Sequence, residues 1–171
     1  SVLAKDSPLP TQKIFSLGIP VLGICYGLQL MGKLLGGEVK KCDRREYGRS
    51  ELSIKKGGSL FKGLPKTLTV WNSHGDAIVR IPKGFQGIAQ TENSKFSAIE
   101  DVKRKFYGLQ FHPEVEHSEQ GVEVIKNFLF SICKCNGDWD MGDFIEIAVE
   151  KIRQQVGSKK VILGLSGGVD S

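Results

Sequence analysis

PVLGICYG, at residues 20–27, is the stretch of this chain that decides its fold. Residues 20–24 form a continuous apolar run, which is typical of a strand that is buried on both faces. Residues 26–35 then carry apolar side chains at helical spacing, and the following glycine pair, Gly36-Gly37, predicts the end of that helix. A buried strand that turns directly into a helix indicates an α/β fold.

The residue at the turn, Cys25, is a candidate nucleophile. Only glycine is expected to fit the crowded flanking positions, Gly23 and Gly27, of a sharp strand-to-helix turn. The amino terminus of the following helix is expected to lower the pKa of the thiol and favour the thiolate. The backbone N–H of Tyr26 is expected to point to the position of a tetrahedral oxyanion. The alternative is a small buried cysteine in a core turn.

A candidate base and its orienting acid lie further along the chain, at His112 and Glu114. Cysteine, base and base-orienting acid are the three parts that nucleophilic acyl transfer requires. The competing base is His74, which we expect in a loop between strands, without an acid to support it. A binding-loop role therefore suits His74 better.

The composition excludes several other classes of function. The 171 residues carry a formal net charge of +5, but the basic residues are scattered among acidic ones and form no stripe for nucleic acid. No apolar run reaches transmembrane length, and the first residues form no signal peptide. The cysteines have neither a disulfide framework nor metal-ligand spacing, so we expect reduced thiols and a cytoplasmic protein. These cysteines are Cys25, Cys42, Cys133 and Cys135.

The middle of the chain predicts a mixed or antiparallel section of sheet, followed by another strand and helices. Five short alternating runs read as strands: Ser50–Ile54, Leu68–Trp71, Ala77–Ile81, Gln86–Gln90 and Phe96–Glu100. The other predicted elements are a short helix at Ser7–Leu17, a strand at Lys105–Phe111, helices at Gly121–Ile132 and Phe144–Val156, and a buried strand at Lys160–Leu165.

The last predicted strand runs into a glycine-rich loop whose backbone N–H groups and hydroxyls suit a pyrophosphate. The loop lacks the Gly-Lys-Ser/Thr of kinases and GTPases, and taken alone it could be a plain glycine turn. Its candidate ATP-binding residues are Ser166, Gly167, Gly168, Val169, Asp170 and Ser171.

Three motifs together resemble the class I, triad-type glutamine amidotransferases: GICYGLQ at 23–29, WNSHGD at 71–76 and GLQFHPEV at 108–115. With GDW at 137–139 and LSGGVDS at 165–171, their order closely resembles the glutamine-hydrolysing GMP synthetases within that class. The resemblance implies a flavodoxin-like open sheet with flanking helices, then the first helix and strand of a Rossmann-like ATP pyrophosphatase domain. It divides the chain into an amidotransferase domain at 1–132, a linker at 133–140 and the start of the ATP domain at 141–171.

The same resemblance implies a role for each matching residue. Cys25 attacks the glutamine side-chain amide, His112 protonates the leaving ammonia and later activates water, and Glu114 orients the imidazole. No metal takes part in this step. The residues expected to bind glutamine are Gln29, Ser73, Gly75 and Asp76.

The resemblance also implies partners and a missing piece. In the full-length, homodimeric enzyme, ATP and Mg²⁺ activate xanthosine 5'-monophosphate, which ammonia converts to GMP. The chain has no initiator Met at Ser1, and an upstream Gly-Gly-Pro loop of the family, with a second oxyanion donor, would lie before it. Loss of such a donor costs about a hundredfold in rate, so we expect a feeble glutaminase that makes no GMP alone. Asn72, where the family commonly has Met, is expected to be tolerated. Two alternatives stay open: a stand-alone cysteine hydrolase such as a γ-glutamyl peptidase, and a non-catalytic regulatory module.

Overall fold

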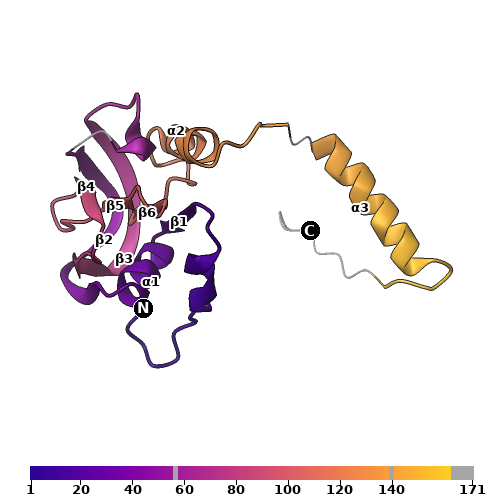
Figure 1. Cartoon of the computed structure of the whole chain (residues 1–171), viewed down its shortest axis with the longest axis horizontal. Coiled ribbons are helices and arrows are strands. Elements are labelled where there is room, and N and C mark those ends of the chain that lie inside the picture. The colour runs from indigo at the N-terminus through magenta and orange to yellow at the C-terminus, as the bar shows by residue number, and fades with distance from the viewer. Residues whose placement is uncertain (56–57, 139–140, 163–171) are drawn as a thin grey trace. The chain divides into compact units, whose positions relative to one another are not determined.

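The computed structural model describes residues 1–55, 58–138 and 141–162 of the chain (Figure 1). The chain divides into two compact units, Ser1–Cys135 and Asn136–Ser171. The first unit holds the sheet and the candidate site, and the second unit begins within the stretch expected as a linker.

The first unit is built on a six-stranded mixed sheet with the strand order β1-β6-β5-β4-β2-β3. Strands β1 and β6 pair in parallel, and the other neighbours are antiparallel. Because β1 and β6 run in the same direction, the residues that follow them meet at one edge of the sheet. The strands are β1 (Val21–Ile24), β2 (Glu38–Ile54), β3 (Thr67–Arg80), β4 (Gln86–Gln90), β5 (Ala98–Asp101) and β6 (Phe106–Leu109).

Helical elements complete the first unit, and α1 begins immediately after the turn at Cys25. The predicted helix at 121–132 is confirmed, and its second half is a π-helix. The predicted helix at 7–17 is a single short 3-10 segment instead. The elements are η1 (Gln12–Ser16), α1 (Tyr26–Leu34), η2 (Ser59–Phe61), α2 (Gly121–Lys126) and η3 (Asn127–Ile132).

Two hydrophobic clusters pack on the sheet, and neighbouring residues of one strand contribute their side chains to different clusters. Ala98 in β5 belongs to one cluster and its neighbour Ile99 to the other, and Tyr107 and Phe106 in β6 divide in the same way. Since successive side chains of a strand point to opposite faces, the clusters cover the two faces of the sheet. One cluster includes Leu60 and Phe61 of η2 and Val124 of α2; the other includes Leu28 and Met31 of α1.

The middle of the chain differs from the prediction in the length of its strands. The predicted runs at 50–54, 68–71 and 77–81 are parts of one long hairpin, β2 and β3. The charged first part of β2 pairs with β3 although it carries few apolar residues. The pairing Lys41↔Asp76 is followed by Glu46↔His74, so residues 42–45 form a bulge in β2. This bulge carries polar side chains to the edge where β1 ends.

The second unit contains the predicted amphipathic helix as α3 (Met141–Val156). The buried strand predicted at 160–165 is not present over its described part: residues 160–162 have no regular structure, and Ile162 is 98% exposed. Residues 163–171, which include the predicted ATP-binding loop Ser166–Ser171, lie outside the described residues.

Candidate active site

Cys25 has an unusual backbone conformation between β1 and α1, with φ 49° and ψ −101°. A non-glycine residue at positive φ is strained by about 1–3 kcal/mol and persists only where its surroundings hold it. The Cys25 N–H donates a hydrogen bond to the Leu109 carbonyl at 2.7 Å, which ties the turn to the end of β6. The strained turn, as predicted, holds the cysteine at the edge of the sheet.

The two glycines around Cys25 have different reasons for being there. A Cβ at Gly23 would lie 2.7 Å from the carbonyl carbon and oxygen of Gly27, so β1 and α1 approach too closely for any side chain. A Cβ at Gly27 would meet nothing within 4 Å. The expectation of crowding is therefore correct for Gly23 and wrong for Gly27.

The Cys25 sulfur lies among backbone and amide groups. Its Sγ is 3.9 Å from the Ser73 carbonyl oxygen and accepts a hydrogen bond from Gln110 Nε2 at 3.8 Å. Burial raises the pKa of the Cys25 thiol above its ordinary value, and the negative charge of Glu114 adds to this. The hydrogen bonds from the Tyr26 N–H and from Gln110 act in the opposite direction but do not outweigh burial. The expectation of a lowered thiol pKa is wrong because the turn is partly buried.

His112 and Glu114 form the base-and-acid pair that the sequence predicts as neighbours. His112 Nδ1 lies 2.6 Å from Glu114 Oε1, which leaves Nε2 for another partner. The backbone N–H of His112 donates to the Trp71 carbonyl at 3.0 Å. Among the described residues, no hydrogen bond joins Cys25 to His112. The structure thus forms the base–acid half of the predicted triad and leaves the sulfur bonded elsewhere.

A cavity of about 550 Å³ opens beside the Cys25 sulfur, at the bulge of β2. All four residues expected to bind glutamine line it, together with the candidate nucleophile and the predicted oxyanion donor. His112 and Glu114 are not among its lining residues. Strand β2 adds two cations, Lys41 immediately before the bulge and Arg45 within it. The predicted residues in the wall are Cys25, Tyr26, Gln29, Ser73, Gly75 and Asp76.

The first unit thus has a cysteine on a strained strand-to-helix turn, and a paired histidine and glutamate lie at the same edge of the sheet. Its sequence matches a known family. Residues 2–132 match the family model of the class-I glutamine amidotransferases. The chain belongs to this family.

Curated relatives of this amidotransferase carry the name GMP synthase, glutamine-hydrolysing. The protein from Brachyspira hyodysenteriae is 52% identical over 171 residues, which is 100% of this chain and 33% of that protein. The protein from Staphylococcus epidermidis is 54% identical over the same 171 residues, again 100% of this chain and 33% of the relative. The chain thus spans about a third of the length of these relatives.

Solved structures agree with the fold of the amidotransferase. The crystal structure of a putative GMP synthase protein from Thermoplasma acidophilum aligns with a TM-score of 0.67 at 32% identity, over 80% of this chain and 64% of that one. A glutamine amidotransferase from Thermotoga maritima aligns with a TM-score of 0.57 at 24% identity, over 85% of this chain and 60% of that one. The second similarity supports the fold alone.

The sequence reasoning missed Gln110, whose side-chain amide contacts the sulfur of this amidotransferase. Gln110 follows β6 directly, beside the turn that follows β1, and is fully buried. Gln29 Nε2 lies 3.5 Å from Gln110 Oε1 and also donates to the Asp76 backbone oxygen at 2.8 Å. The signal was present: Gln110 lies two residues before His112, inside a motif that already pointed to the site.

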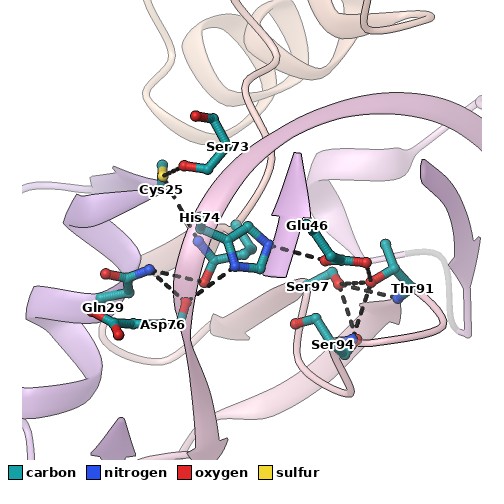
Figure 2. Close-up of polar contacts among 10 residues, drawn as sticks. Cys25, Gln29, Glu46, Ser73, His74, Asp76, Thr91, Ser94 and Ser97 are labelled. Carbon is teal, nitrogen blue, oxygen red and sulfur yellow. Dashed lines mark hydrogen bonds and ion pairs between the residues drawn. The ribbon is translucent and has the colours of Figure 1, made fainter. Parts of the chain in front are cut away.

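His74 of the amidotransferase differs most from its expected environment. It does not lie in a loop but in β3, where it is buried, and its Nε2 lies 3.0 Å from Glu46 Oε2 (Figure 2). Burial alone would raise the pKa of Glu46, but hydrogen bonds with His74 and Thr91 hold it below its ordinary value. His74 therefore has the supporting acid that the sequence reasoning did not find. Ser73, Gly75 and Asp76 likewise belong to β3 and not to a loop.

Asn72 is buried in β3 of the amidotransferase, one residue before Ser73. The side-chain oxygen and nitrogen of Asn72 have no hydrogen-bond partner among the described residues. A buried amide without partners costs about 1–3 kcal/mol. Asn72 is thus expected to lower the stability of the first unit.

Two further classes of site are absent from the described residues. No group of three or more His, Cys, Asp or Glu residues is arranged to hold a metal ion in the part of the amidotransferase that the structure describes. Within the same residues, no helix has the length and apolar character needed to cross a membrane. Cys25, Cys133 and Cys135 are free thiols.

Proposed function

We propose that this chain is the glutamine-hydrolysing part of a GMP synthase. It releases ammonia from the side-chain amide of L-glutamine, and a further part of the longer protein uses that ammonia to convert xanthosine 5'-monophosphate to GMP. The observation that carries the proposal is the 52% and 54% identity to GMP synthases over all 171 residues, which include the strained Cys25 turn and the His112–Glu114 pair. A cytoplasmic location fits this role.

In the first chemical step, Cys25 attacks the side-chain carbonyl carbon of glutamine. Because burial raises the pKa of the thiol, the sulfur stays protonated until His112 Nε2 removes the proton. Before this proton transfer, the S–H group must turn from the Ser73 carbonyl towards the imidazole. The tetrahedral oxyanion accepts a hydrogen bond from the Tyr26 N–H, which already points at the sulfur.

Collapse of the tetrahedral intermediate breaks the C–N bond. His112 returns its proton to the nitrogen, which leaves as ammonia, and Cys25 keeps the acyl group as a thioester. His112 then takes a proton from water, whose oxygen attacks the thioester, and glutamate and the free thiol are formed. Glu114, at 2.6 Å from Nδ1, stabilises the imidazolium that exists between these transfers.

The cavity offers groups of both charges for the amino-acid end of glutamine. The carboxylate of Asp76 lies in its wall, where it accepts a hydrogen bond from Ser1 Oγ, and suits the α-amino group. The Ser73 hydroxyl and the backbone N–H of Gly75, two residues that also line the cavity, suit the α-carboxylate. Gln29 supports this wall through its bond to the Asp76 backbone oxygen.

The second half of the proposed reaction belongs to the remainder of the longer protein. ATP with Mg²⁺ activates the O2 of xanthosine 5'-monophosphate as an adenylate, and ammonia displaces AMP. Residues 141–171 are proposed as the start of the ATP pyrophosphatase domain, with α3 as its first helix and Ser166–Ser171, which lie outside the described residues, as its pyrophosphate loop. The homodimer of the full-length protein belongs to the same proposal.

The test compares two nitrogen sources in the full-length protein encoded by the gene that contains this sequence. With ATP, Mg²⁺ and xanthosine 5'-monophosphate, we expect GMP to form from either glutamine or ammonium chloride. Cys25→Ser should abolish GMP formation from glutamine and retain it from ammonium, and the control Cys133→Ser should retain both. Glutamine-dependent synthesis by the Cys25→Ser variant at the parent rate would overturn the proposal, and hydrolysis of glutamine without any GMP would indicate a stand-alone hydrolase.

A further inference from the structure

Glu46 and His74 form a buried pair next to the cavity. They lie opposite each other on the neighbouring strands β2 and β3. The bulge at residues 42–45 ends where Glu46 pairs with His74, and their side chains are only 3% and 2% exposed. Removing a carboxylate from water costs several kcal/mol, so such a group is found inside a protein only where its hydrogen bonds are satisfied.

Both oxygens of the Glu46 carboxylate are satisfied. Oε2 faces His74 Nε2 at 3.0 Å, and Oε1 accepts from Thr91 Oγ1 at 2.7 Å. The Thr91 hydroxyl in turn accepts from the Ser94 backbone N–H at 3.2 Å and from Ser97 Oγ at 3.3 Å. Figure 2 shows this chain of contacts running from the imidazole into the loop after β4.

Both nitrogens of the His74 ring are also used. Nδ1 lies 3.1 Å from the Asp76 backbone oxygen, which can only accept a hydrogen bond. An ionised Glu46 can only accept as well, so both contacts are hydrogen bonds when the ring carries both protons. The pair therefore holds the Asp76 carbonyl in one position.

Two routes lead from this pair to the Cys25 sulfur. In the first, the Asp76 carbonyl oxygen that His74 holds also accepts from Gln29 Nε2 at 2.8 Å, and Gln29 lies 3.5 Å from Gln110 Oε1. Gln110 Nε2 then donates to the sulfur at 3.8 Å.

The second route runs through the loop that Thr91 anchors. The Ser97 carbonyl oxygen accepts a hydrogen bond from the Gln110 backbone N–H at 2.8 Å. The backbone and the side chain of Gln110 are thus held from two directions, and both begin at Glu46.

We propose that Glu46 and His74 are positioning residues for the reaction at Cys25, which fix Gln110 against the sulfur through the Asp76 carbonyl and the Thr91–Ser97 loop. Neither residue touches the reacting atoms. A buried ion pair is often replaceable by apolar residues without loss of stability, so the presence of this pair next to the cavity is better explained by geometry than by stability. This inference rests on the proposed glutaminase function for its kinetic readout only.

The first experiment separates geometry from charge in the full-length protein. Glu46→Ala should lower kcat for glutamine hydrolysis about tenfold or more, with KM changed less than about threefold, because small displacements at a reacting centre are costly. Glu46→Gln should keep kcat within about twofold, since the amide has the shape of the carboxylate and can hydrogen-bond to both His74 and Thr91. The matched control is Glu38→Ala, an exposed acid in the same strand, which should behave as the parent. Equal losses in the Ala and Gln variants of Glu46, or no loss in either, would overturn the inference.

The second experiment does not need glutamine hydrolysis. Iodoacetamide labels thiols at a rate set by their thiolate fraction, and peptide mass spectrometry follows Cys25 and Cys133 in the same sample. The Gln110 hydrogen bond favours the thiolate. If this hydrogen bond is lost in Glu46→Ala, His74→Ala or the milder Thr91→Val, the labelling rate of Cys25 should fall about threefold or more relative to that of Cys133. Glu46→Gln should leave this ratio of labelling rates unchanged.

A Cys25 labelling rate that is unchanged or raised in Thr91→Val and in the Ala variants would overturn the positioning role. If the parent protein fails to hydrolyse glutamine, the proposed function fails, but the labelling rates still decide the inference. Thr91→Val keeps the shape of the side chain, so the test stands even if Glu46→Ala does not fold.

Discussion

At the scale of single residues, Glu114 acts on its two neighbours in opposite directions. Its carboxylate lies 2.6 Å from His112 Nδ1, where it stabilises the protonated base. The same negative charge raises the pKa of the Cys25 thiol and so opposes formation of the thiolate. In the proposed mechanism, this one carboxylate would assist proton transfer by His112 and would add to the effect of burial, which keeps the Cys25 thiol protonated.

Replacing Glu114 by Gln should separate these two effects. Without the charge, the pKa of the Cys25 thiol falls, so more thiolate is present at neutral pH and iodoacetamide should label Cys25 faster than in the parent. Glutamine hydrolysis should instead slow about tenfold or more, because the imidazolium loses its carboxylate. Labelling and hydrolysis rates measured at one pH check both effects, with the exposed Glu116→Gln as the control. If Cys25 labelling and glutamine hydrolysis both became faster, or both became slower, Glu114 would not act on Cys25 and His112 in opposite directions.

At the scale of elements, the junction of β1 and α1 depends on one glycine and not on the other. Gly23→Ala would place a Cβ 2.7 Å from the Gly27 backbone, which cannot move without shifting the helix. We expect a loss of about 3 kcal/mol or more, the upper end for overpacking. Gly27→Ala has open space and gains helix propensity, so it should be neutral or more stable by up to about 1 kcal/mol. Urea unfolding of both variants checks this, and equal losses would show that the close approach of β1 and α1 is not what requires glycine.

The elements also explain which features the sequence could predict. β1 and α1 were predicted because their apolar residues follow one period without interruption, and this placed Cys25 at the turn. The first part of β2 was not predicted, since its charged residues carry no period and the strand forms only by pairing with β3.

The same limit applies to the site. The acid of His74 is 28 positions away in the sequence, and only the register after the bulge brings Glu46 to it. The pair at His112 was visible because the acid lies two positions along the chain. Contacts within a motif can therefore be predicted from the sequence, whereas contacts that depend on strand register cannot.

At the scale of the whole molecule, carboxylates couple the stability of the first unit to pH. Glu38, Glu46 and Asp101 each have a pKa below the ordinary value. For Glu46 and Asp101, burial acts against this lowering and hydrogen bonds outweigh it; for Glu38, the cause is exposed Lys40 and Arg80. A carboxyl whose pKa is lower in the folded than in the unfolded chain contributes stability above the unfolded pKa, and that contribution is lost as the pH falls through the folded pKa.

Glu46 should account for a measurable part of this acid sensitivity. In the parent, the free energy of unfolding should fall as the pH drops below about 4.3, the ordinary glutamate value, because protonation breaks the bonds to His74 and Thr91. Glu46→Gln has no proton to gain, so its curve should be flatter, by on the order of 1 kcal/mol between pH 6 and pH 3. Glu38→Gln should follow the parent closely, because its partners are exposed and surface ion pairs contribute little. Urea unfolding at several pH values measures these free energies of unfolding. If the parent and Glu46→Gln gave parallel curves, protonation of the Glu46 carboxylate would not change the stability of the fold, and this prediction would be wrong.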